Sequence, residues 1–368
     1  MSSAKRKLEE RRERRDRLAR IATVILLLAG AGVAYFVFDP LGSSSGPDAD
    51  SEGGASSLVF ADFDGVKDLH HLDLDSREDV IVTALPKSGN TIASQSSSWL
   101  VIQVEEEDEG RRKPTQYLFD PDAGITVDLG ILVEPEFSPD GQRLAGLRPV
   151  DDSLCRPTRC GGDKVVVVVD LDDPENESEL SEPGRFILRG WAGNHLLVSN
   201  NPGQGDPILQ SISPAGDVAD LPFPPGDLWG ASPDGNYVIE SGDGGTRFHE
   251  FSAGRVVDDA GEIGIPAGSV LEDGVWSHDS SLVVSFAVDD AGELVLVSFG
   301  PTDLEPEILA DGGESSTGTI MWAPENDAVA ITRFNGTELE AVYCMVNEPD
   351  SCEVLFAWTR GISLLRLE

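Results

Sequence analysis

One motif recurs along this chain at a nearly constant spacing, and that spacing restricts the fold more than any other feature. The copies read FSPDGQRLAGL, GASPDGNYVIES, WSHDSSLVVSF and WAPENDAVAITRF, and their equivalent positions are Ser138, Ser232, Ser277 and Ala323. The separations are 94, 45 and 46 residues, so the first spans about two periods. A degenerate copy is therefore expected in between, and GWAGNHLLVSNN at 190–201 occupies that place. A weaker copy, SQSSSWLVIQV, lies at 94–104.

Each repeat unit carries roughly four short β-rich runs, such as HLLVSN, NYVIES, LVVSFAV and ELVLVSF, separated by Gly, Asp and Pro. Four strands per unit at a period of about 40–54 residues are typical of the blades of a β-propeller. We therefore predict an all-β fold, a β-propeller over residues 58–368.

The units predict the number of blades. Six full units are expected at 88–130, 131–184, 185–226, 227–268, 269–313 and 314–360. The segment from Leu58 lacks a first strand, while GISLLRLE at the C-terminus is a strand without a unit, so the two can pair and close the ring. Seven blades are favoured; six is the alternative if unit 88–130 merges with its neighbour.

The motif itself has the chemistry of a turn. Pro sets φ, Asp bonds its own backbone, and Gly accepts a positive φ. The aromatic residue before the turn can wedge between neighbouring blades. We therefore predict a structural role, with no catalytic one, for Phe137, Ser138, Pro139, Asp140, Gly141, Ser232, Pro233, Asp234, Gly235, Trp276, Ser277, Asp279 and Trp322.

The W/F-S-P-D-G motif followed by an apolar strand resembles the WD-like repeat of TolB-type propellers. Similar repeats form the non-catalytic propeller of prolyl-oligopeptidase-type peptidases. VFADFDGVKDLHHLDLDSREDVIVTAL at 59–85 is similar to the remainder of such a blade. The resemblance covers most of residues 58–368 and implies the fold, but it says almost nothing about a ligand.

The N-terminal region reads as a membrane anchor. Residues 1–20 carry nine Lys or Arg, and residues 21–38, IATVILLLAGAGVAYFVF, carry no charge. Eighteen helical residues span about 27 Å, close to the ~30 Å hydrocarbon core, and the basic segment is expected to stay cytoplasmic. We predict a cytoplasmic segment at 1–20, an uncleaved transmembrane helix at 21–38, a flexible acidic Gly/Ser linker at 39–57 and an extracytoplasmic domain beyond it. A cleaved signal peptide is the alternative, but its apolar core is usually shorter.

The formal net charge of −39 repels phosphate backbones, which argues against a nucleic-acid-binding role. Basic partners and cations are favoured instead. An acidic composition adapted to salt accounts for the same charge without any specific ligand.

The four cysteines form two close pairs in predicted hairpin loops. We predict the disulfides Cys155–Cys160 and Cys344–Cys352, which suit an extracytoplasmic domain. A zinc site is the alternative, but CxxxxC has no CxxC partner and no His lies beside either pair.

No catalytic set accompanies the repeat. His195, His249 and His278 fall in separate units, and His70 and His71 point to opposite faces of one strand. SGDGGTRF at 241–248 matches a sialidase-type box, but it joins a second strand to a third, and we interpret it as coincidence. We predict no enzyme activity, no metal and no cofactor.

The function expected from the sequence is a protein-interaction or scaffold module held at the membrane. The alternative is a small-ligand or carbohydrate-binding sensor, or a hydrolase, that uses the central channel. Tryptophans could stack on sugars there, but their places near the repeat motif favour packing between blades; they are Trp99, Trp191, Trp229, Trp276 and Trp322.

Overall fold

The computed structural model describes residues 57–367, apart from gaps at 63–67, 75, 85–89, 94–98, 109–110, 121–122, 157–158, 202–205, 227, 243–244, 265–270, 289–293, 314, 336–337, 349–350 and 359–361. Within these residues the chain is built from β-strands, with one short 3-10 turn at Asp152–Leu154. The prediction of an all-β fold is confirmed.

The described strands form seven four-stranded antiparallel sheets, which we call blades 1–7 in chain order. Within each blade the strands are given from the innermost to the outermost. Blade 1 contains β30 (Ile362–Leu367), β1 (Ser57–Asp62), β2 (Asp68–Asp73) and β3 (Asp79–Ala84). Blade 2 contains β4 (Asn90–Ala93), β5 (Leu100–Asp108), β6 (Arg111–Asp120) and β7 (Ile125–Gly130). Blade 3 contains β8 (Val133–Phe137), β9 (Arg143–Pro149), β12 (Lys164–Asp170) and β13 (Glu177–Glu179). A two-stranded hairpin, β10 (Cys155–Arg156) and β11 (Arg159–Cys160), is inserted between β9 and β12.

The remaining blades follow the same order. Blade 4 contains β14 (Phe186–Ala192), β15 (His195–Asn200), β16 (Ile208–Ile212) and β17 (Val218–Asp220). Blade 5 contains β18 (Leu228–Ala231), β19 (Tyr237–Gly242), β20 (Gly245–Ser252) and β21 (Arg255–Glu262). Blade 6 contains β22 (Leu271–Trp276), β23 (Val283–Val288), β24 (Leu294–Phe299) and β25 (Glu307–Gly313). Blade 7 contains β26 (Ser315–Trp322), β27 (Ala328–Asn335), β28 (Glu338–Met345) and β29 (Glu353–Trp358).

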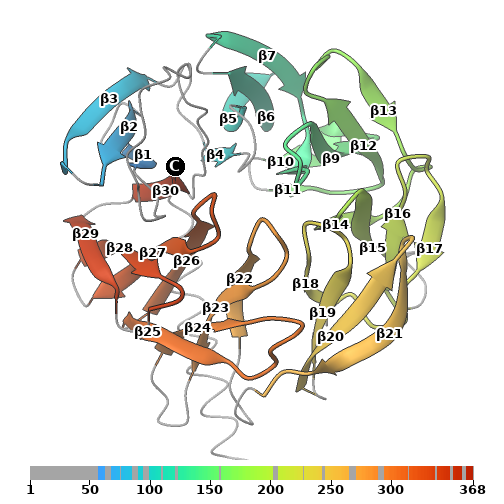
Figure 1. Ribbon diagram of the computed structural model, residues 1–368. Coiled ribbons are helices and arrows are strands. Elements are labelled where there is room, and N and C mark those ends of the chain that lie inside the picture. Colours follow the sequence, from blue (N-terminus) through green and yellow to red (C-terminus); the bar gives the residue numbers. More distant parts are fainter. Residues whose placement is uncertain are drawn as a thin grey trace, which may run out of the picture.

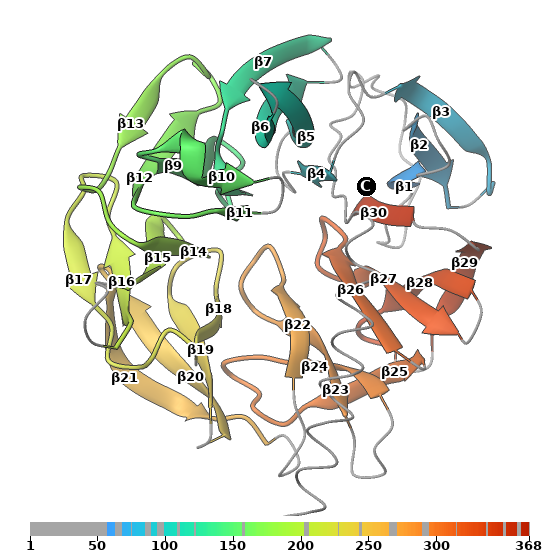
Figure 2. The ribbon, with the colours of Figure 1, turned by 180° about the vertical axis from the view of Figure 1, so that it is seen from behind.

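The sheets follow one another in chain order around a common centre, and the two ends of the chain meet in blade 1 (Figures 1 and 2). Strand β30 pairs antiparallel with β1, from Leu58 opposite Leu367 to Asp62 opposite Ile362. The last strand thus takes the innermost place of the first sheet, as predicted. Because β4–β7 form a sheet of their own, the alternative of six blades does not describe this arrangement.

The core lies between the sheets. Leu147 and Val166 of blade 3 pack against Phe186, Leu188 and other buried side chains of blade 4, and similar clusters fill the other interfaces described. Each fully buried apolar side chain contributes about 1.5–3 kcal/mol, so most of the stability depends on contacts between neighbouring blades.

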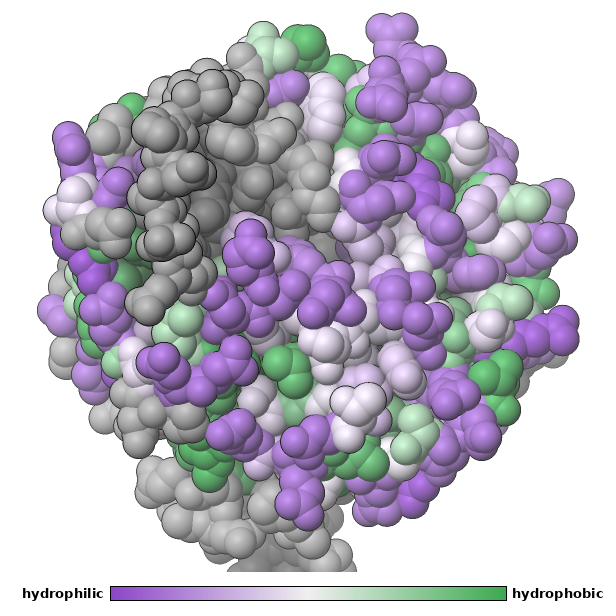
Figure 3. All heavy atoms as spheres, viewed as in Figure 1, coloured by the Kyte–Doolittle hydropathy of each residue, from purple (hydrophilic) through white to green (hydrophobic). Residues whose placement is uncertain are grey.

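The antiparallel order gives the ring two different faces. Links between first and second strands and between third and fourth strands lie at one end of each sheet, which we call the turn face. Links between second and third strands, and from blade to blade, lie at the other end, which we call the connection face. The view in Figure 3 shows a mostly hydrophilic surface with small, separate hydrophobic groups.

The predicted cytoplasmic segment, the transmembrane helix at 21–38 and the linker up to residue 56 lie outside the described residues. In the part of the chain that is described, no helix is long and apolar enough to cross a membrane.

Candidate functional site

The repeat motif forms the same turn in three blades. In blade 5, the Tyr237 N–H donates to Ser232 Oγ at 2.9 Å, and the Asn236 N–H donates to Asp234 Oδ1 at 2.9 Å. Ser232 Oγ in turn donates to Asp234 at 2.7 Å. The equivalent bonds are made by Ser138, Asp140, Gln142 and Arg143 in blade 3 and by Ser277, Asp279, Ser281 and Leu282 in blade 6. The carboxylates of the motif therefore accept hydrogen bonds from the backbone of their own turns.

These bonds alter the acidity of two carboxyl groups. Burial alone would raise the pKa of Asp140, but hydrogen bonds from Ser138 and the Gln142 N–H, together with Arg143, bring it below the ordinary value. The pKa of Asp279 is lowered in the same way, by Ser277 and Ser281 against the effect of burial. Both groups are thus ionised turn residues at neutral pH.

One position of the turn has a positive φ in four blades, at Gly141, Gly235, Ser280 and Asn326. In blades 5, 6 and 7 this position contacts the turn of the preceding blade. A Cβ on Gly235 would lie 2.9 Å from the backbone of Ala192 and Gly193, so the turns of blades 4 and 5 touch directly. In blade 6, Ser280 Oγ accepts from the Asp234 N–H at 3.0 Å, and in blade 7, Asn326 Oδ1 accepts from the His278 N–H at 2.7 Å.

The tryptophans before the turn are buried between blades. Trp191 Nε1 donates to the carbonyl of Glu136 at 3.1 Å, and Trp322 Nε1 donates to that of Val275 at 2.9 Å. Both acceptors directly precede the aromatic residue of the preceding blade. Trp276 is also buried, but its Nε1 has no hydrogen-bond partner among the described residues. With exposed fractions of 5%, 3% and 7% for Trp191, Trp322 and Trp276, these rings are not available to stack on a sugar.

The other two tryptophans considered for stacking are partly buried. The ring of Trp229 packs against Gly274 of blade 6, where any larger residue would collide with it. Trp99 packs at the edge of the core between blades 2 and 3.

Both predicted disulfides are present, one on each face of the ring. Cys155 and Cys160 face each other across β10 and β11 on the connection face. Cys344 and Cys352 join β28 to the link before β29 on the turn face. Since every described cysteine is bonded, the zinc alternative loses its ligands.

The histidines lie apart and have local roles. His70 lies 2.9 Å from Asp79, and His249 lies 2.8 Å from Glu240. Burial lowers the pKa of His195. SGDGGTRF links β19 to β20, the second and third strands of blade 5. Among the described residues, no three His, Cys, Asp or Glu side chains form a group that could hold a metal ion.

Two carboxylates lie side by side on the innermost strand of blade 3. Glu134 accepts a hydrogen bond from the Leu188 N–H at 2.8 Å. Glu136 has its carboxylate close to Gly190. Desolvation by the surrounding protein, and to a lesser degree the charge of Glu134, raise the pKa of Glu136 to about 7. The Glu136 side chain keeps exposed surface, so water screens part of this effect.

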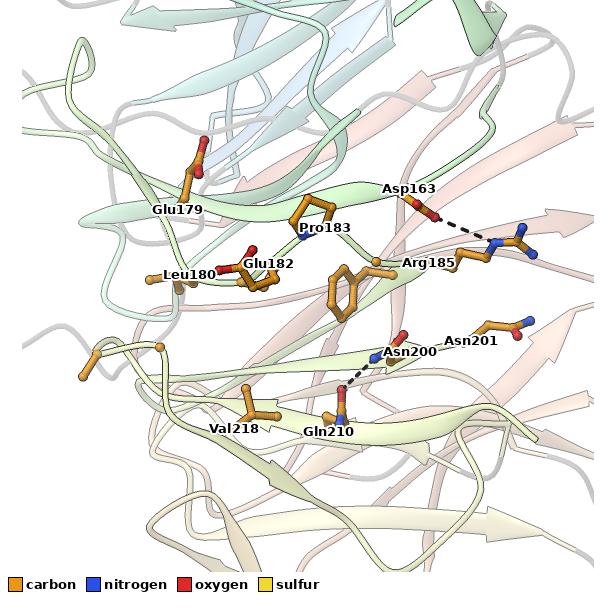
Figure 4. Close-up of a pocket in the computed structure, with 15 residues that line it drawn as sticks. Asp163, Glu179, Leu180, Glu182, Pro183, Arg185, Asn200, Asn201, Gln210 and Val218 are labelled. Atoms are coloured by element: carbon orange, nitrogen blue, oxygen red, sulfur yellow. Dashed lines mark hydrogen bonds and ion pairs between the residues drawn. The ribbon is translucent and has the colours of Figure 1, made fainter. Parts of the chain in front are cut away.

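A groove of about 870 Å³ runs between blades 3 and 4 (Figure 4). One wall is the end of β13, with Glu179, and the connection from β13 to β14, with Glu182 and Pro183. The other is blade 4, with Asn200, Asn201, Gln210 and Val218. Exposed fractions of 58% for the Asp163 side chain, 61% for that of Arg185 and 52% for Val218 show that the groove is open to solvent.

Hydrogen bonds fix the walls of this groove. Asn200 donates to Gln210 at 3.3 Å, and Gln210 donates to Asp220 at 2.8 Å, which forms a polar row across β15, β16 and β17. The opposite wall is tied to β12, because the backbones of Lys164 and Gly184 exchange hydrogen bonds of 2.7 and 2.9 Å. The lining carries three carboxylates, Asp163, Glu179 and Glu182, against one guanidinium, Arg185.

The sequence did not reveal this groove. Asn200 and Gln210 belong to β-rich runs, and only the fold brings them opposite the Glu179–Phe186 connection. The one available signal was the run SELSEPGR at 178–185, a polar link between two repeat units.

No family model matches the sequence, and no curated protein matches it. Among solved structures, the β-propeller domain of the Trilobed protease from Pyrococcus furiosus matches with a TM-score of 0.54 and 10% identity, over 82% of this chain and 91% of that one. A post-proline cleaving enzyme from Rickettsia typhi matches with a TM-score of 0.56 and 10% identity, over 83% of this chain and 52% of that one.

TolB from Acinetobacter baumannii also matches, over 84% of this chain and 67% of that one, at 11% identity and with a TM-score of 0.46, too low to support an argument. At such identities a match shows the fold alone, since unrelated functions share one architecture. What the comparisons show of this chain is a β-propeller fold.

Proposed function

We propose that this chain is a membrane-anchored, extracytoplasmic β-propeller that serves as a protein-interaction or scaffold module. The basic segment, the apolar run and the polar linker support the anchoring. Two disulfides support an oxidising compartment for the propeller. The proposal is for a binding module rather than an enzyme, as the sequence motifs predict.

The observation that carries the binding role is the groove between blades 3 and 4. Enclosed pockets for small ligands are lined mainly by hydrophobic side chains. This groove instead presents side-chain amides and carboxylates on walls fixed by hydrogen bonds. Such a surface suits an extended polypeptide segment, whose backbone groups the amides can bind. The excess of carboxylates favours a segment that carries Lys or Arg.

The test uses full-length protein in detergent and a library of extended peptides that differ in charge. We expect basic peptides to bind more tightly than acidic ones. Reversing the groove charge with Glu179→Lys and Glu182→Lys weakens that binding by about tenfold, or about 1.4 kcal/mol. The matched control is Glu305→Lys with Glu307→Lys, on the exposed edge of blade 6. Equal losses of affinity in the two double variants would show that only net charge matters and that the groove is not the binding site.

A further inference from the structure

A second cavity, of about 640 Å³, opens on the connection face of blade 4. It lies where β14, β15 and β16 meet the link from β17 to β18. That link, LPFPPG at 221–226, forms one wall, and its three prolines make the wall stiff. This cavity faces blade 5, whereas the groove described above faces blade 3.

The lining is mainly apolar. Ile187 and Ile208 keep 42% and 39% of their surface exposed although they are large hydrophobic residues. Behind them, Leu209, Leu221 and Phe223 are buried and belong to the core between blades 4 and 5. The cavity therefore offers solvent-accessible apolar surface.

One cation, Arg189, enters this apolar lining. It occupies a bulge in β14, since the register with β15 shifts between Leu188 and Gly190, and Gly190 has a φ of +124°. A bulge re-aims a side chain out of the regular strand pattern. Arg189 Nε donates to the buried Ser199 Oγ at 2.8 Å, which fixes the guanidinium at the cavity.

Arg189 differs from the other arginines near it in the fold. Arg148 pairs with Glu177, and Arg143 lies beside Asp140. For Arg189, no carboxylate lies within ion-pair distance among the residues that the structure describes. Arg189 is exposed and lines the cavity, so its guanidinium can bind an external anion there.

We propose that this cavity binds an organic monocarboxylate with an apolar body, such as a medium-chain or aromatic acid. The planar guanidinium matches a carboxylate, and Ile187, Ile208 and the proline wall cover the apolar part. Asp206 also lines the cavity, and its charge disfavours a dianion such as a phosphate monoester. The volume lies within the range of small-molecule pockets.

Isothermal titration of the full-length protein with octanoate tests this site. Octanoate binds saturably, whereas octanamide, of similar size and without charge, and acetate, without the apolar chain, bind about tenfold more weakly or worse. Arg189→Gln weakens octanoate binding by about tenfold or more. The control, Arg255→Gln, removes the same charge from an exposed arginine of blade 5 and leaves binding unchanged.

A second variant covers the case in which Arg189→Gln does not fold. Ile187→Asp places a carboxylate on an exposed position of the same wall and abolishes octanoate binding by repulsion. The proposal is overturned if octanoate does not bind at millimolar concentration, or if Arg189→Gln or Ile187→Asp binds it like the wild type. Glu179→Lys with Glu182→Lys keeps octanoate binding, so failure here and failure of the protein-binding groove are distinguishable.

Discussion

The hydroxyl oxygen of Ser280 lies 3.0 Å from the backbone nitrogen of Asp234 and accepts its hydrogen bond, although the two residues belong to different blades. Asn326 makes the equivalent bond to His278 in the next pair of blades. Between blades 4 and 5 the same place is filled by direct contact of Gly193 with Gly235. The positive-φ position of the repeat turn therefore joins successive blades along the turn face.

Replacing Ser280 by Ala tests this link. The Asp234 N–H loses its acceptor, and the free energy of unfolding falls by about 1–3 kcal/mol. Urea unfolding followed by tryptophan fluorescence measures the change. Ser252→Ala, at an exposed serine of blade 5, is the control and changes stability by less than about 0.5 kcal/mol. Equal effects of the two substitutions would contradict a role for Ser280 between blades.

The buried tryptophans provide a matched pair. Trp322→Phe leaves the carbonyl of Val275 without its donor, whereas Trp276→Phe removes a buried N–H that has no partner among the described residues. Both substitutions lose similar packing, so the difference isolates the hydrogen bond. We expect Trp322→Phe to be the more destabilising by about 1 kcal/mol, measured by urea unfolding. A larger loss for Trp276→Phe would show that the indole bond contributes nothing.

The turn carboxylate Asp140 makes stability depend on acid pH. Its pKa in the folded state lies below the ordinary 3.8, so ionised Asp140 stabilises the fold above about pH 4, and this contribution is lost as pH falls through the lower folded value. Asp140→Ala lowers the melting temperature at pH 7. The difference in melting temperature between the variant and the wild type becomes smaller below pH 4. Thermal denaturation across pH 3–7 measures it. A gap that does not change with pH would refute the linkage.

Glu136 affects the pH dependence of stability in the opposite direction. Its pKa is raised to about 7, so the folded state holds this proton more tightly than the unfolded chain and loses stability as pH rises from about 4.5 to 7. Glu136→Gln removes this loss and keeps the backbone carbonyl that accepts from Trp191. The variant is more stable than the wild type at pH 8, and the advantage disappears at pH 5. Thermal denaturation at pH 5 and pH 8 measures this difference. A variant that is more stable than the wild type at pH 5 alone would contradict the raised pKa of Glu136.

Much of the fold could be predicted because it depends on local rules that recur. The spacing of Ser138, Ser232 and Ser277 sets the blade period, and Asp140 bonds its own turn wherever that turn is formed. The pairing of the C-terminal strand with the first blade could be predicted because segment 58–85 has only three strands and the C-terminal strand belongs to no other unit.

The two candidate binding sites could not be predicted, for a physical reason. The direction of Arg189 depends on a bulge in β14 and on Ser199, which lies on the neighbouring strand. The groove depends on how far the Glu179–Phe186 connection stands from β16. Neither relationship produces a repeated spacing in the sequence, so no sequence pattern predicts it.

Site-specific photo-crosslinking in the groove tests whether a protein binds between blades 3 and 4. A benzophenone amino acid replaces Val218, which lines the groove, or Val257, which is 59% exposed in blade 5 and serves as the control. Irradiated membranes of cells that express the full-length protein are then examined by mass spectrometry. We expect a discrete crosslinked protein at position 218, absent at position 257 and lost when Glu179→Lys and Glu182→Lys are introduced. No crosslink at position 218, or the same crosslinks at both positions, would contradict a protein-binding groove between blades 3 and 4.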